Sequence, residues 1–176
     1  MKPKTTYRRH RGVLSVMLVA LILTLAAVLG SGSLATAADP LVIDFPAGLA
    51  CDFDLRVEIR GGNQVVKEFV DKNGNVVRML SAGKGSALLF TNLSTGATFS
   101  LKANGSVSHI TFNPDGSYTQ TITGHNVLIL FPTDVPAGPS TTLHLGRVVF
   151  TVDTSGVFTV QQVSGQTTDI CAVLSE

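Results

Sequence analysis

The feature that most constrains this chain is a regular succession of short β-forming runs and glycine-containing turns. Residues 53–59 alternate apolar and polar side chains, which is the period-two pattern of a strand with one face in water. Asn73-Gly74 and Asn104-Gly105 favour two-residue hairpin turns, because both residue types tolerate a positive φ. The pattern continues to the end of the chain and predicts an antiparallel β protein.

About ten runs rich in Val, Ile, Thr, Phe and Leu lie between the turns, and no stretch after residue 38 carries a helical apolar stripe. We expect Gly124-His125-Asn126 to form a turn between two strands, and the segment around Gly165 to form another. Residues 169–174 read as the last strand. Residues 132–140 contain three prolines, which exclude a central strand and predict an ordered surface loop.

Short connections between consecutive strands favour pairing of neighbours, so the strands should form an antiparallel meander. Such a meander either closes into a flattened β-barrel, which removes its free edges, or folds into a two-sheet β-sandwich. We expect the barrel, with the sandwich as the alternative.

The first 38 residues predict a secretory signal peptide. Five basic residues and no acid lie within residues 1–12, and residues 13–29 form an apolar run that only Ser15 and Thr24 interrupt. Ala35 and Ala37 fit an A-x-A cleavage site, with cleavage next to Ala38. We therefore expect residues 1–38, an N-terminal helix, to be removed, and residues 39–176 to form a single all-β domain that is secreted, extracellular or associated with the cell surface. The membrane would be a partner only through an uncleaved signal segment.

Removal of the signal peptide makes the chain acidic. Five of the thirteen Lys and Arg residues leave with it, so eight bases face twelve acids. This balance argues against nucleic acid as a partner, because nucleic-acid binding needs a basic surface. The sequence identifies no other partner.

Cys51 and Cys171 are the only two cysteines, and an exported chain favours their pairing. The disulfide would tie the first strand of the mature domain to the last, an arrangement that suits a closed meander. Closing a loop of this length should stabilise the fold through the entropy of the unfolded chain.

The motifs of known chemistry are incomplete in this sequence. Alternating Asp71, Asn73 and Asn75 resemble the opening of a calcium loop, but the glycine and glutamate that should follow are absent. The three histidines of the mature chain are scattered, and no nucleophile elbow is present. We therefore expect no catalytic residue, no metal ligand and no cofactor.

Four stretches of the sequence carry a resemblance to known proteins: "FPAGLACDFDLRVE", "TNLSTG", "GHNVLILF" and "TTDICAVL". With its early C-x-F and its terminal D-[IV]-C, the chain resembles a group of small, uncharacterised secreted actinobacterial β-proteins. The resemblance implies an exported β domain with a terminal disulfide, and it contributes no catalytic residue.

These observations predict a non-enzymatic extracellular or cell-surface domain with a binding or structural role. Two alternatives stay open: a barrel that carries a small apolar ligand, which the run at residues 126–131 could line, and a barrel enzyme of the cyclase or isomerase type. A pocket of roughly 300 Å³ or more with apolar walls would favour a carrier, and converging polar groups within it would favour an enzyme.

Overall fold

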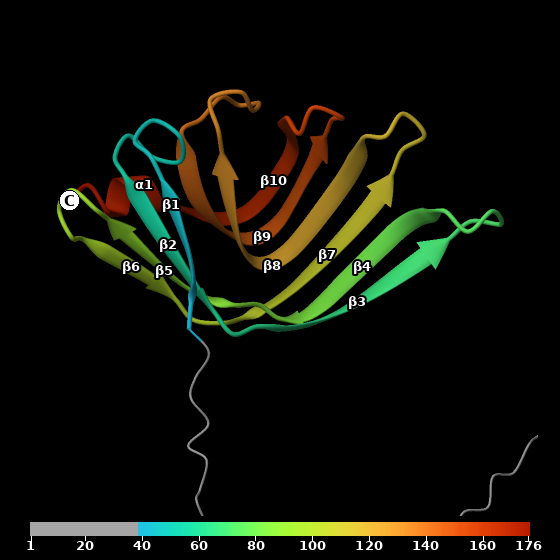
Figure 1. The fold of residues 1–176 in the computed structure, drawn as a ribbon, viewed down its shortest axis with the longest axis horizontal. Helices are drawn as coiled ribbons and strands as arrows, with labels where there is room; N and C mark the ends of the chain where they lie inside the picture. Colours follow the sequence, from blue (N-terminus) through green and yellow to red (C-terminus); the bar gives the residue numbers. More distant parts are fainter. Residues whose placement is uncertain (1–38) are drawn as a thin grey trace, which may run out of the picture. The chain divides into compact units, whose positions relative to one another are not determined.

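Two antiparallel sheets make up most of the part of the chain that the structure describes, residues 39–176 of a computed structural model (Figure 1). The smaller sheet has four strands in the order β1-β2-β5-β6, and the larger has six in the order β10-β9-β8-β7-β4-β3. Their bounds are β1 Leu41–Phe45, β2 Leu55–Arg60, β3 Asn63–Val70, β4 Val76–Lys84, β5 Ala87–Asn92, β6 Thr98–Leu101, β7 Gly105–Phe112, β8 Tyr118–Leu130, β9 Ser140–Val152 and β10 Phe158–Asp169. The chain ends in a short helix, α1, Ile170–Val173.

The predicted all-β class and antiparallel pairing are confirmed, but no closed barrel is found in residues 39–176. The strand orders explain this result. The first strand, β1, lies at an edge of the smaller sheet, whereas the last strand, β10, lies at an edge of the larger one. The two strands are therefore not neighbours, as closure of the meander would require.

Three successive connections carry the chain from one sheet to the other. Gly61-Gly62 joins β2 to β3, Gly85-Ser86 joins β4 to β5, and residues 102–104 join β6 to β7. Strand β7 pairs with β8 only as far as Ser106–Gly124, and β6 then pairs with β5 alone. We call this place the fork: here the pairing of β7 with β8 ends, and the smaller sheet diverges from β8.

A row of glycines crosses the larger sheet beside the fork. Gly124, Gly146 and Gly165 are direct neighbours in register on β8, β9 and β10, with φ angles of 104°, 157° and 101°. A Cβ atom on any of them would collide with the backbone of the adjacent strand, so only glycine fits. Each lies near the middle of its strand, and Figure 1 shows these three strands strongly curved.

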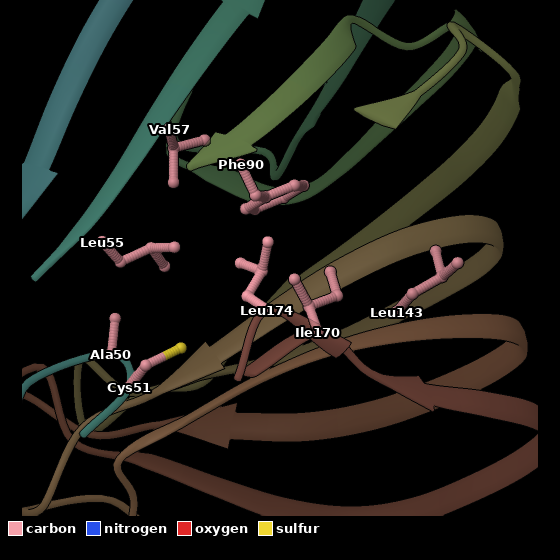
Figure 2. Packing of buried hydrophobic residues seen from close by; sticks show 8 residues of the cluster. All are labelled: Ala50, Cys51, Leu55, Val57, Phe90, Leu143, Ile170 and Leu174. Carbon is pink, nitrogen blue, oxygen red and sulfur yellow. The ribbon is translucent and has the colours of Figure 1, made fainter. Parts of the chain in front are cut away.

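Two separate hydrophobic clusters lie on the two faces of β8 and β9. The larger one lies between the two sheets and includes Leu55 and Phe90 from the smaller sheet and Leu143 from β9 (Figure 2). The smaller one lies on the concave face of the larger sheet, where Ile122 and Leu128 come from opposite sides of Gly124. A straight strand could not bring these two side chains into one cluster.

The predicted disulfide between Cys51 and Cys171 is present, with 5.6 Å between the Cα atoms. It does not join two strands as we expected. Cys51 lies in the connection between β1 and β2, and Cys171 lies in α1, whose first turn is capped by the Asp169 carboxylate accepting from the Ala172 amide at 3.0 Å. The N-cap aspartate turns the predicted last strand into a helix.

Three predicted turns are wrong. Asn104-Gly105 forms no two-residue hairpin, because β6 and β7 belong to different sheets and Gly105 is the first residue of β7. Gly124 and His125 lie within β8, and Gly165 lies within β10. A glycine beside a glycine on the next strand bends the sheet there without ending the strand. The strand β1 was not predicted, whereas the loop at residues 132–140 lies between β8 and β9 as expected.

The predicted signal peptide and its cleavage residues Ala35, Ala37 and Ala38 lie outside the described residues. Within residues 39–176, no helix has the length and hydropathy needed to cross a membrane.

Candidate functional site

The concave face of the larger sheet holds an open trough of about 510 Å³. This volume is well within the ~300–1,000 Å³ of small-molecule sites. Its twelve lining residues are Gln64, Ser106, Ser108, Gln120, Ile122, Asn126, Val127, Leu128, Ile129, Phe131, Phe150 and Phe158. None of these side chains is charged, so the trough is a neutral site.

Amides and hydroxyls from four adjacent strands form a polar row along one side of the trough. The Gln64 amide donates to the Ser106 hydroxyl at 3.1 Å and accepts from the Ser81 hydroxyl at 3.1 Å. The Gln120 amide donates to the Ser108 hydroxyl at 2.8 Å. These bonds hold the polar side chains in place, and the row presents both donors and acceptors.

Aromatic and aliphatic side chains form the opposite, apolar wall. The rings of Phe150 and Phe158 are stacked with 5.2 Å between centroids and 27° between planes. Phe150 is buried, and Ile122 and Leu128 pack in the same cluster. The wall is therefore apolar, with Phe158 as the more exposed ring of the stacked pair, and it faces a row of neutral hydrogen-bonding groups.

The loop between β8 and β9 contributes Phe131 to the lining of the trough and is anchored to β10. Val135 forms a parallel bridge with Thr159, and the backbone amide of Val135 donates to the Phe158 carbonyl at 2.8 Å. The Asp134 carboxylate is 4% exposed and accepts from the amides of Phe131 at 2.6 Å and Phe158 at 2.9 Å. Asp134 therefore fixes two of the phenylalanines that line the trough.

Two buried polar atoms on this face have no hydrogen-bond partner within the described protein: Asn126 Nδ2 and His144 Nδ1. Asn126 lines the trough, and His144 is directly opposite it in register on β9. His144 is 6% exposed, and desolvation lowers the pKa of its imidazole, which favours the neutral form. Buried polar groups in native proteins are normally satisfied, so Asn126, the one of the two that lines the trough, marks a place where a bound polar group would be stabilised.

The structure places the other histidines elsewhere. His109 faces away from the trough, on the convex side of the sheet, and His125 lies at the fork. The hairpin turn between β3 and β4 contains Asp71, Asn73 and Asn75. The Asp71 carboxylate accepts there from the backbone amides of both asparagines. No group of three or more metal-ligating side chains occurs in the described part of the chain.

Sequence reasoning missed the trough because its residues come from five segments that are far apart in the chain. His144 lies between Leu143 and Leu145 in β9, so the alternation of the strand places it on the face opposite to the one on which these leucines pack. Its burial on the opposite face depends on the curvature of the sheet. The in-register glycines are the one signal in the sequence that could have indicated this curvature.

Comparison with known proteins adds no identification, since no protein-family model, no curated protein and no solved structure matches this chain.

Proposed function

We propose that this chain is a non-enzymatic binding domain that acts outside the cytosol and holds a neutral saccharide unit in the trough. The observation that carries the proposal is the unpartnered buried Asn126 Nδ2, which lies in the lining of the trough beside a neutral row of amides and hydroxyls. Leaving such an atom unsatisfied costs roughly 1–3 kcal/mol, so a ligand that binds it gains affinity.

The chemistry of the lining favours a saccharide. A sugar ring has an apolar C–H face and a rim of hydroxyls that both donate and accept hydrogen bonds. The Phe150–Phe158 pair offers an apolar surface for that face, and Gln64, Ser106 and Gln120 offer neutral partners for the hydroxyls. A charged ligand would lose its hydration in the trough and find no opposite charge among these side chains.

Binding is favoured over catalysis because the polar groups of the trough already bond to one another. Ser106 and Ser108 each accept from a glutamine amide, which does not activate a hydroxyl as a nucleophile. Export is supported by the signal sequence, by the disulfide and by the resemblance to secreted actinobacterial β-proteins.

A glycan array of neutral saccharides, followed by isothermal titration calorimetry on the best binder, tests the proposal. We expect Gln120→Ala to weaken binding about three- to tenfold, as the loss of one hydrogen bond predicts. Gln161→Ala is the matched control, because Gln161 is an exposed glutamine of β10 that does not line the trough. Absence of any saccharide binding, or equal weakening by both variants, would contradict the proposal.

A further inference from the structure

The fork contains a second cavity, which shares Asn126 and Val127 with the trough but differs from it in its other lining residues and in chemistry. It has a volume of about 300 Å³ and opens where the smaller sheet leaves β8. Its walls are the apolar side chains of Ile59, Leu88 and Leu101 from the smaller sheet and of Val127 and Leu143 from the larger one. Leu143 is a buried member of the main hydrophobic cluster and the other four residues pack against it, so the cavity extends from solvent into the space between the sheets.

The mouth of this cavity is polar and carries a positive charge. Asn104 Nδ2 lies 3.1 Å from His125 Nδ1, a contact that spans the base of the fork just beyond the last backbone pair of β7 and β8. Lys102 is exposed at the same mouth, and no carboxylate is among the eleven lining residues. The two ion pairs found within residues 39–176, Arg56–Asp44 and Arg60–Glu58, leave the Lys102 ammonium uninvolved.

We infer that the fork cavity binds a single-chain amphiphile with a carboxylate head, whose chain lies among Leu88, Leu101 and Val127 and whose head pairs with Lys102. The apolar walls match the chain, and the lone cation at the mouth matches the head. The volume is at the lower end of the ~300–1,000 Å³ of ligand sites, which favours one medium-length chain over a two-chain lipid.

Calorimetric titration of the full chain with decanoate, below its micelle concentration, tests this inference. Decanol and decyltrimethylammonium have the same chain with a neutral and a positive head. We expect decanoate to bind at least threefold more tightly than either, because only its head pairs with Lys102. Equal binding of the three amphiphiles, or no binding of decanoate, would overturn the inference.

Two charge-reversal variants separate a specific contact from general attraction. Lys102→Glu should weaken decanoate binding about three- to tenfold. Lys72→Glu changes the net charge equally, but Lys72 lies in the distant β3–β4 turn and should leave binding unchanged. Both substitutions are at exposed sites and should preserve folding. Equal weakening by the two variants would show a non-specific charge effect and reject the site.

Methyl NMR spectra of the decanoate complex locate the chain. Shifts at Leu88 and Leu101, which line the fork cavity and not the trough, would support the inference. Shifts confined to Ile122 and Leu128 would place the amphiphile in the trough and overturn it.

Discussion

The molecule has two halves that differ in how many layers of sheet they contain. In the two-layered half, the smaller sheet packs on β8 and β9, and Leu55, Phe90 and Ile170 are 0% exposed. In the single-layered half, β3 and β4 extend from β7 with no second sheet over them, and Val65 and Val70 are 72% and 60% exposed. The same β-forming composition therefore produces a packed core on one side of the fork and a bare sheet on the other.

The difference between the halves shows that a strand can be fully hydrogen-bonded to its neighbour while its side chains remain exposed to solvent. Strand β3 is fully paired with β4, yet seven of its eight residues are exposed. Its free edge carries Lys67 and Glu68, charges that oppose pairing with another chain. Regions with few buried apolar contacts open at low free energy, so the β3–β4 hairpin should be the least stable part of the sheet.

The largest expected effect on the free energy of unfolding comes from comparing two phenylalanine substitutions, one in each half. Phe90→Ala should lower the free energy of unfolding by about 3–5 kcal/mol, because a fully buried ring leaves a cavity. Phe69→Ala, in β3, should cost about 1 kcal/mol, since its partly exposed ring mainly contacts the cations of Lys67 and Arg78. Urea denaturation of both variants measures the difference, and equal losses would show that the single-layered half contributes as much as the core.

The disulfide belongs entirely to the two-layered half. Replacing Cys51 and Cys171 together with serine should lower the free energy of unfolding by about 2–4 kcal/mol, because the unfolded chain regains the entropy of a loop with a sequence separation of 120. In hydrogen-exchange experiments, protection should fall first in α1 and in the β1–β2 connection. An unchanged melting temperature would remove the structural role that we assign to this bond.

The boundary between the halves depends on glycine. Gly124→Ala should cost about 2–3 kcal/mol, because φ is 104° and the new Cβ would collide with the Gly105 carbonyl. Gly96→Ala is the control: its φ is also positive, at 79°, but no atom lies within 4 Å of the added Cβ. We expect about 1 kcal/mol there, from the backbone conformation alone. Thermal unfolding distinguishes the two sites, and similar losses would mean that the sheet tolerates a side chain at its bend.

This glycine row also marks the limit of what the sequence could predict. Most of the strands, the Asn73-Gly74 hairpin and the cysteine pairing follow from local patterns and from residue count, and they were predicted. In the sequence alone, a glycine within a strand, such as Gly124 or Gly165, cannot be distinguished from a glycine in a turn between two strands. Only the register of β8, β9 and β10 shows that the glycines are neighbours and that the sheet bends there.

The candidate site was beyond sequence reasoning for the same reason. Gln64, Gln120 and Phe158 share no local motif, and they meet only because the sheet curves. The helical end of the chain was also missed, since residues 169–174 have strand-like composition and the Asp169 cap decides the outcome.

The smallest effect concerns His144, which lies on the concave face at the inner side of the bend. Burial lowers the pKa of its imidazole in the folded state, whereas the unfolded value is near 6.5. Below that pH the unfolded chain therefore binds a proton that the folded chain does not. The contribution of neutral His144 to the free energy of unfolding is fully present above about pH 6.5. It decreases as the pH falls, by at most about 1.4 kcal/mol per pH unit.

His144→Gln should remove this slope between about pH 6.5 and 5, as measured by urea denaturation at several pH values. The carboxylates with lowered pKa values, Asp44, Asp71 and Asp115, lose their contribution at lower pH and do not interfere. His109→Gln, on the opposite face of the sheet, should keep the slope that His144 causes. If His144→Gln keeps the slope as well, another group causes it, and burial does not lower the pKa of His144 as we expect.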